Sequence, residues 1–476
     1  MRGWRRWFPR LVDSLVADRI ATVDAVTEAP SPLQPIDLSD DASVTEVLDL
    51  AERVGEVVLA AGTAVTDTTT QIEFIASTYG LDKTDIDVTY NSIRIYADRG
   101  PKLPPASTMR IVHYRSLDFT RLAAVDRLTR RIRRELVPPQ EALAALEEIT
   151  TAPHPYQRWV ATVGWALMAA SIALLLGGDW LISLLSFATT AAIDRTNRIL
   201  NGRGLPFFFQ HMAGGFIAAV PAVLMATFAS HLHIDPSLII AAGIAVLLAG
   251  LQLVGAVEDA ITGAPITASA RMLEVLMMTC GIIAGIVVAL RVSVLLGATA
   301  PPIDMVATRD LTNWPLKVVA GAIASLAFAL ACYAERRALA AATFSGAAAT
   351  VFYLGVQQAG FGPVVSSGVA AVVVGLAGGL MARRALTPPL VVAIAGITPL
   401  LPGLKVYRGL YAILNDAQLL GLNQLFSAFA VGGALAAGVT LGEWFARTLR
   451  QPRIVQRFGS IRRPRMQQVV SDENPA

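Results

Sequence analysis

Residues 272–292 read MLEVLMMTCGIIAGIVVALRV, an apolar run long enough to cross a bilayer. A bilayer core of about 30 Å needs about 20 such residues in a straight helix. Nine other segments approach this length: 159–176, 180–197, 206–228, 237–256, 315–334, 338–357, 363–382, 386–404 and 422–446. The sequence therefore predicts an α-helical polytopic membrane protein with about ten transmembrane helices.

Composition separates these segments from the first third of the chain. Hydrophobic residues make up 54% and charged residues 16%, which is too apolar for an ordinary soluble protein. Charges are nevertheless frequent before about Thr151. The net charge of +3 provides no basic field for nucleic acid. The two cysteines, Cys280 and Cys332, lie in apolar blocks, where no disulfide framework is expected.

The N-terminal region divides into an arm and a folded part. Residues 1–37 contain clustered arginines and then three prolines, which predict a basic arm and a linker. In residues 38–151, apolar residues recur at helical spacing in some stretches and alternate with polar residues in others. Helices are expected over 44–61, 67–79, 119–136 and 139–149, and strands around 86–95 and 109–113. This part is predicted to be a cytosolic α+β domain.

The loops between the apolar segments differ in charge from one side to the other. Arginines follow the second, sixth and eighth segments, at positions 195, 198, 203, 336, 337, 383 and 384, whereas the opposite loops at 177–179, 231–237 and 357–362 contain no Lys or Arg. Basic loops remain in the cytosol. We therefore expect a cell-membrane protein whose two termini, including a tail over 451–476, are both cytosolic.

A short pattern occurs twice in the apolar part. Ala-Gly-Ile, Leu-Leu and Gly-Leu within residues 242–251 recur at the same spacing within residues 395–404. Chance can produce such a match in a chain rich in Ala, Gly and Leu, but this one joins the fourth segment of each set of five. Membrane repeats over 157–304 and 315–450 with five spans each must have opposite orientations, an inverted repeat typical of secondary transporters.

Two stretches are too polar or too rich in proline to continue as lipid-facing helices. The first, 258–271, contains Gly263 and Pro265, and the second, 396–408, contains Pro399 and Pro402. Proline removes an amide donor and crowds the preceding turn, so helices are expected to break at these four residues. Broken helices in transporters expose backbone groups that bind charged ligands.

A zwitterionic amino acid needs an acceptor for its ammonium group, donors for its carboxylate and a small polar pocket. Asp259 and Asp416 are candidates for the first, Arg271 and Arg408 for the second, and Thr262, Thr267 and Thr398 for the third. Glu274, one turn beyond Arg271, is an ionisable residue inside an apolar segment and a candidate for coupling. The alternative is that all of these are solvated residues at helix ends.

Several functions are disfavoured by the motifs that the sequence lacks. It contains no phosphate-binding G-x-x-x-x-G-K-[ST], no H-E-x-x-H and no G-x-S-x-G, so an ATP-driven pump, a zinc protease or a hydrolase of these types is not expected. No cofactor or metal is predicted. A secondary transporter is favoured over a membrane-anchored enzyme or sensor, with export of a small amino acid or of a dicarboxylate as the alternatives. Whether the chain forms a homo-oligomer stays open.

Longer motifs indicate a family. They are LAAGT (59–63) with Asp67, GLPFF (204–208), DAITGAPITASAR (259–271), CYAE (332–335), PPLVVAIAGITP (388–399) and LGEW (441–444). With these motifs the chain closely resembles the threonine/serine exporter (ThrE) family of actinobacteria, over about residues 22 to 450. The resemblance implies ten transmembrane helices, a cytosolic N-terminal domain, and export of L-threonine and L-serine driven by the proton motive force. It names no substrate-binding residues.

Overall fold

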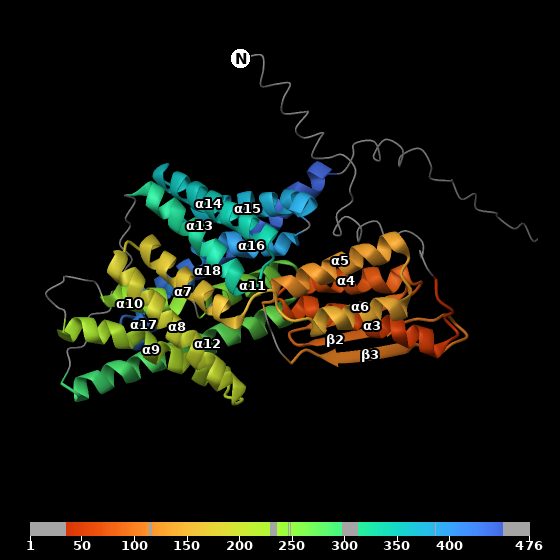
Figure 1. Cartoon of the computed structure of the whole chain (residues 1–476), viewed down its shortest axis with the longest axis horizontal. Coiled ribbons are helices and arrows are strands. Elements are labelled where there is room, and N and C mark those ends of the chain that lie inside the picture. Colours follow the sequence, from red (N-terminus) through yellow and green to blue (C-terminus); the bar gives the residue numbers. More distant parts are fainter. Residues whose placement is uncertain are drawn as a thin grey trace, which may run out of the picture.

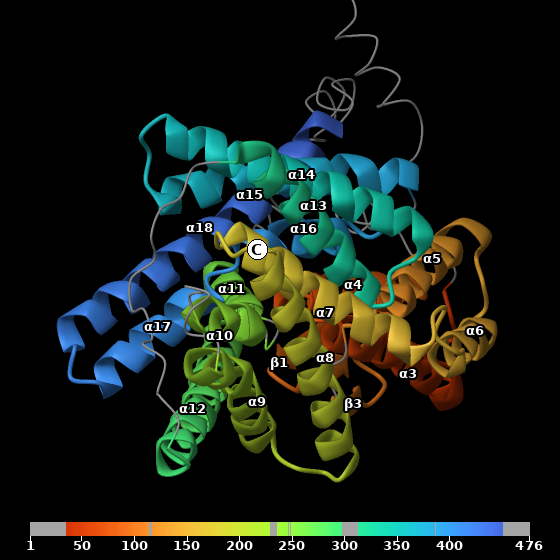
Figure 2. The ribbon, with the colours of Figure 1, turned by 60° about the vertical axis from the view of Figure 1, so that its left-hand side comes forward.

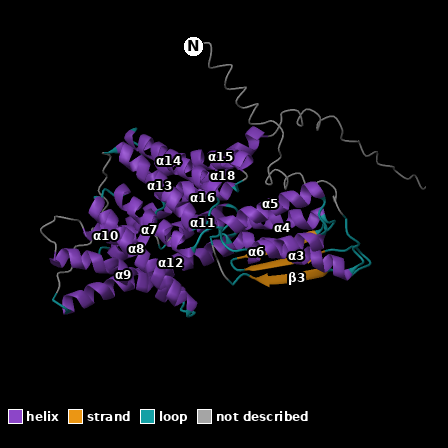
Figure 3. Ribbon diagram, in the orientation of Figure 1, coloured by secondary structure: helices purple, strands orange, loops and turns teal. Residues whose placement is uncertain are grey.

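The computed structural model describes residues 35–113, 117–228, 236–245, 247, 249–297, 313–385 and 387–450. Nearly all of the predicted basic arm (1–37) and the whole predicted tail (451–476) lie outside these residues. In the described part, helices dominate and one small sheet lies at one end of the molecule (Figure 3).

The N-terminal part is built from four helices and three strands. These are α3 (Asp41–Ala60), α4 (Val65–Thr78), β1 (Thr84–Thr89), β2 (Ser92–Ala97), β3 (Ala106–Ile111), α5 (Phe119–Glu135) and α6 (Pro139–Thr151). The strands form an antiparallel sheet in the order β1-β2-β3. Each predicted helix and strand of this region has a counterpart within a few residues.

Alternation along the strands decides which face of the sheet is covered. In β2, Ile93 and Ile95 are buried, whereas Arg94 and Tyr96 point to the exposed face. Helices α3 and α4 pack on the buried face, and α5 and α6 pack beyond α3 (Figure 1). The N-terminal part is therefore layered, and its open sheet face points away from its helices.

The rest of the described chain is helical. A first set consists of α7 (Arg158–Leu175), α8 (Trp180–Gly202), α9 (Phe207–Phe228), α10 (Pro236–Ala245), α11 (Ala249–Ile261) and α12 (Pro265–Leu295). A second set consists of α13 (Trp314–Ala331), α14 (Arg336–Gln358), α15 (Pro363–Ala385), α16 (Pro389–Ile397), a short 3-10 turn η2 (Thr398–Leu400), α17 (Gly403–Leu414) and α18 (Gln418–Arg450).

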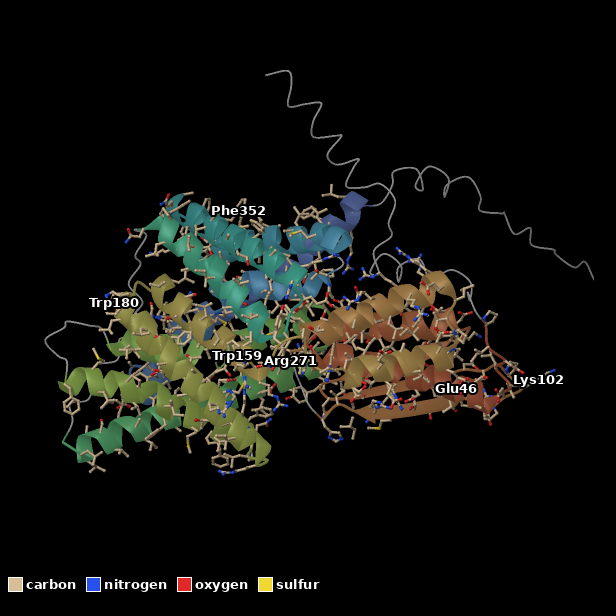
Figure 4. The ribbon with its side chains drawn as sticks, in the orientation of Figure 1. Glu46, Lys102, Trp159, Trp180, Arg271 and Phe352 are labelled. Atoms are coloured by element: carbon tan, nitrogen blue, oxygen red, sulfur yellow. The ribbon has the colours of Figure 1, made fainter. Side chains whose placement is uncertain are left out.

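Length and composition identify the helices that can cross a membrane. Among the described residues, seven qualify singly: α7, α9, α12, α13, α14, α15 and α18. The pair α16 and α17, bent by 45° at the prolines, would make an eighth. Large apolar side chains such as Phe352 of α14 are exposed on these helices, as expected for surfaces that face lipid (Figure 4). The chain is thus a polytopic membrane protein.

The two sets of helices have matching bounds. Each of the first three helices of the second set begins the same number of residues after its counterpart in the first set; the pairs of first residues are Arg158 and Trp314, Trp180 and Arg336, and Phe207 and Pro363. The fourth and fifth segments share a second offset, with the pairs Pro236 and Pro389, and Pro265 and Gln418. The same spacings pair the residues with positive φ that end helices: Gly177 with Tyr333, Gly204 with Gly360, and Gly263 with Asp416. Asp416 therefore corresponds to Gly263 and not to Asp259.

Helix breaks occur at both predicted places. Helix α11 ends at Ile261 and α12 begins at Pro265, with Gly263 between them. Helix α16 gives way to η2 before Pro399, and α17 begins after Pro402. The ninth segment therefore does not end at residue 404 as predicted, because its helix resumes as α17.

A third break was not predicted. The expected continuous segment 237–256 is divided into α10 and α11, with Leu247 in a turn between them. Directly after this break, a Cβ atom on Gly250 would lie 2.6 Å from the amide nitrogen of Gly403. The two glycines occupy matching positions of the repeated pattern, so the two broken segments meet backbone to backbone.

The N-terminal part packs against one end of the membrane helices (Figures 1 and 2). The backbone N–H of Phe119 donates to the carbonyl of Cys332 at 3.0 Å, and the Phe119 ring lies 6.0 Å from that of Phe328. Arg127 of α5 pairs with Glu335 at 2.8 Å. One hydrophobic cluster contains residues from both parts, so apolar packing continues across their boundary.

Candidate functional site

A cavity of about 640 Å³ lies where the N-terminal part meets the membrane helices. Its wall combines the loop between α3 and α4 with residues of α4, α7, α8, α11, α12, α16 and α18. Figure 4 places Arg271, one of the lining residues, at this boundary. The volume falls within the range of small-molecule binding sites.

The loop at the cavity wall is shaped by a glycine. Helix α3 ends with Gly62 at a φ of +88°, a conformation that disfavours residues with a Cβ atom. The chain then turns through Thr63 and enters α4 at Val65. As a result Thr63, Asp67 and Thr70 all reach the cavity.

Asp259 and Arg271 hold the start of α4 from the membrane side. Asp259 Oδ1 accepts a hydrogen bond from the backbone N–H of Val65 at 3.0 Å, and Asp259 Oδ2 lies 3.0 Å from Arg271 Nη1. Arg271 Nη2 donates to the carbonyl of Thr63 at 3.4 Å. Both side chains are almost fully buried. The break between α11 and α12 is thereby joined to a helix N-terminus, where a carboxylate satisfies an amide that lacks an intrahelical partner.

Carboxylate residues from five elements line the cavity, among them Asp126 of α5 and Asp194 of α8. Asp67 comes from α4, Glu258 from α11 and Glu443 from α18, and the charges of Asp67 and Glu443 act on Glu258. Within the described chain, the carboxylates of Asp67 and Glu258 take part in no hydrogen bond or ion pair. Burial raises the pKa of Asp67, and the positive charge of Arg447 partly opposes this rise.

Arginines supply the opposite charge. Arg158, Arg198, Arg271 and Arg447 line the same cavity. Arg198 pairs with Asp194 at 2.8 Å, and Arg447 lies 3.8 Å from Glu443. The wall therefore offers both acceptors for an ammonium group and donors for a carboxylate.

The structure brings together two of the residues predicted as a site and separates the others. Asp259 and Arg271 form the buried pair, and Arg271 lines the cavity. The remaining candidates are not among the described residues that line it: Thr262, Thr267, Glu274, Thr398, Arg408 and Asp416. Two of these threonines donate their hydroxyls to carbonyls of their own helical segments, Thr262 to Glu258 and Thr398 to Ile394. Thr267 and Arg408 are buried, Glu274 is half-buried and Asp416 is exposed.

Several cavity residues were missed as site residues by the analysis of the sequence. Glu258 adjoins Asp259, and Asp67 lies in a family motif, but neither was selected as a candidate. Glu443 lies in the LGEW motif and was not selected either. The sequence does show that these acidic residues lie next to apolar segments. Only the folded structure shows that the three carboxylates, which are distant in the chain, share one cavity.

Comparison with known proteins adds to this geometry. Residues 49–293 match a model of threonine/serine exporters, and residues 317–455 match the model described as "Threonine/Serine exporter, ThrE". The "Threonine/serine exporter" of Corynebacterium glutamicum is 44% identical over 439 residues, covering 91% of this chain and 90% of that protein. The chain belongs to the threonine/serine exporter family.

A second relative of this exporter leads to the same family. The "Probable threonine/serine exporter" of Mycobacterium tuberculosis is 40% identical over 417 residues, covering 86% of this chain and 78% of that protein. No solved structure matches. Membership confirms the resemblance seen in the motifs and identifies the chain as an amino-acid exporter of the membrane and not an enzyme.

Proposed function

We propose that this chain exports small amino acids, L-threonine and L-serine, from the cytosol in exchange for protons. The observation that carries the proposal is the cavity at the boundary between the two parts, whose wall holds charges of both signs. A zwitterion matches such a wall. A dicarboxylate would instead place its two negative charges beside Asp67, Glu258 and Glu443, an arrangement that like charges disfavour.

The arrangement of helices supports alternating access through an inverted repeat. Both sets have the same order of helices, matching left-handed residues, and a fourth segment broken at a corresponding place. With five segments in each set, the two sets have opposite orientations, and the molecule has ten spans if α8, α10 with α11, and α16 with α17 each count as one. Rocking of one set against the other would open the cavity alternately to the two sides.

The position of the N-terminal part supports the proposed orientation. Arg198, in the arginine-rich end of α8, lines the same cavity as Asp67. Glu335, just before Arg336 and Arg337, pairs with Arg127 of α5. The loops with many arginines therefore lie on the side of the N-terminal part. By the positive-inside rule we infer that this side faces the cytosol.

Proton coupling is supported by the carboxylates of Asp67 and Glu258, which take part in no hydrogen bond or ion pair among the described residues. Asp67 has a raised pKa, so it holds its proton at a higher pH than an ordinary aspartate does. If the substrate ammonium and a proton compete for Asp67 and Glu258, binding of one releases the other, and exchange results. Asp259 takes part by holding α4 in place through its carboxylate.

The proposal is tested by counterflow in proteoliposomes that contain the purified chain. We expect labelled L-threonine to accumulate against unlabelled L-threonine or L-serine, and an imposed pH gradient to drive net movement. If a labelled C4 dicarboxylate accumulates and labelled threonine does not, the exported substrate is a dicarboxylate and not an amino acid. Net movement of threonine that does not respond to the imposed pH gradient would refute proton coupling.

A further inference from the structure

Gln252 of α11 contributes an uncharged amide to the cavity wall. Its side chain is the only polar one in the stretch AGLQLVGAV (249–257). The residue is half-buried and lines the cavity. Among the residues that the structure describes, its amide forms no hydrogen bond, and both of its polar atoms remain accessible, whereas Oε1 of Gln71 in the same wall is enclosed. The Gln252 amide is therefore open to a ligand that occupies the cavity.

The position of Gln252 along α11 puts this amide at the end of the cavity that is remote from the N-terminal part. Asp259, near the other end of α11, contacts the amide of Val65. Gln252 precedes Asp259 by seven residues, which is about 10 Å along a helix. It also comes two residues after Gly250, whose backbone approaches that of Gly403. Gln252 thus lies inside the membrane part, beside the place where the two broken segments meet.

The wall around Gln252 is apolar. Leu251 and Val254 flank it on α11, and Ile394 and Ile397 of α16 line the same cavity. Val254 and Ile397 belong to one hydrophobic cluster. A ligand that fills this part of the cavity displaces water from the amide, so it loses affinity unless it supplies a hydrogen bond in place of the water. One amide in an apolar wall therefore matches a short side chain that carries one hydroxyl.

The charged groups of the wall lie nearer to the N-terminal part. Glu258 follows Gln252 by nearly two turns of α11, and Asp67 belongs to α4. Arg271 passes over Gly255, since a Cβ atom on this glycine would lie 2.8 Å from Arg271 Nη1. Charged groups bind an ammonium or a carboxylate more strongly than an amide does. An amino acid held by these groups at its charged end therefore directs its side chain toward Gln252.

We propose that Gln252 recognises the side-chain hydroxyl of the exported amino acid. This inference rests on the proposed export of amino acids. The amide can accept a hydrogen bond from the hydroxyl through Oε1 or donate one to it through Nε2. An otherwise identical amino acid without the hydroxyl leaves the amide without a partner, so the site discriminates against it.

The test compares substrates that differ only by the hydroxyl. L-2-aminobutyrate is L-threonine without its hydroxyl, and L-alanine is L-serine without it. Counterflow of all four is measured in proteoliposomes for the wild type, Gln252→Met and Gln252→Asn. Gln252→Met keeps the unbranched shape and removes the amide, whereas Gln252→Asn keeps an amide on a shorter side chain. The matched control is Gln357→Met, which removes an amide that donates to the Tyr353 hydroxyl within α14, outside the cavity wall.

The wild type is expected to prefer each hydroxylated amino acid over its deoxy analogue. In Gln252→Met this preference should fall about 10-fold, the loss expected for one hydrogen bond, with counterflow of the deoxy analogues retained. Gln252→Asn should keep part of the preference, and Gln357→Met should keep all of it.

The possible results separate this assignment from the proposed function. An unchanged preference in Gln252→Met, or an equal loss in Gln357→Met, overturns the role of Gln252 and leaves the proposed export intact. If Gln252→Met is present in the membrane and exchanges none of the four amino acids, Gln252 serves the helix packing and the assignment is overturned as well. If the wild type exchanges no amino acid at all, the proposed function itself is refuted.

Discussion

Replacing Asp259 by alanine removes two contacts at once. The variant loses the acceptor of the Val65 amide and the partner of Arg271, each at 3.0 Å. The side chains of Asp259 and Arg271 are 0% and 4% exposed. The variant therefore leaves the charge of Arg271 buried without its ion pair to Asp259. The contact between the membrane helices and α4 should weaken accordingly.

The size of the effect follows from this burial. Removing one partner of a buried ion pair costs about 3–5 kcal/mol, and losing the cap of a helix costs about 1 kcal/mol more. The double variant Asp259→Ala with Arg271→Met removes both charges of the pair, so the second change should recover most of the stability lost by the first. This failure of additivity is the specific prediction for a coupled pair.

Hydrogen exchange measures the effect where it occurs. In Asp259→Ala the amides of residues 65–68 should exchange at least about 100-fold faster than in the wild type, since each 1.4 kcal/mol changes an opening equilibrium about tenfold. In the double variant most of this increase should disappear. As a control, Glu141→Gln breaks an exposed pair with Arg131, worth about 0.2–1 kcal/mol, and should leave these amides unchanged.

Asp259→Asn separates the two roles of this side chain. The amide oxygen can still accept from Val65, but the charge opposite Arg271 is gone. We expect export driven by a pH gradient to fall steeply while the protein stays folded in the membrane. If the amides of residues 65–68 stay protected from exchange in Asp259→Ala, Asp259 does not hold the start of α4. If Asp259→Asn exports at the wild-type rate, the charge of Asp259 plays no part in coupling.

Three further predictions concern the cavity, the packing and the topology. Burial raises the pKa of Asp67 above its ordinary 3.8, so the packing of α4 against the membrane helices should lose stability as the pH rises through the raised pKa. Hydrogen exchange of the α4 amides, measured as a function of pH, should show this loss in the wild type and not in Asp67→Asn. In Gly215→Ala the new Cβ would lie 2.2 Å from the Ile282 carbonyl oxygen, so α9 and α12 must separate; thermal unfolding in detergent should show a loss of about 1–3 kcal/mol, and the roomier Gly243→Ala a smaller one. A reporter fused after Ala476 should read as cytosolic and one inserted in 357–362 as extracytoplasmic, and the reverse result would invert the proposed orientation.

Much of the local structure was predictable because it depends on neighbours in the chain. Helical and alternating patterns located every helix and strand of the N-terminal part within a few residues. Proline and glycine located the breaks at Gly263 and Pro399, since each acts on its own backbone. The break between α10 and α11 was missed because no proline marks it. It accompanies the close packing of Gly250 on Gly403, a contact between distant segments.

The sequence by itself determined the membrane class, the number of apolar segments, the repeated pattern and the family, because hydropathy and motifs are properties of contiguous residues. Only the tertiary structure decided which charges pair and which line the cavity. Asp259 was predicted as a substrate or coupling residue, yet its carboxylate contacts an amide 194 residues away and the Arg271 guanidinium. Gln252, Asp67 and Glu258 acquire their significance the same way, since a cavity exists only once separate segments have packed around it.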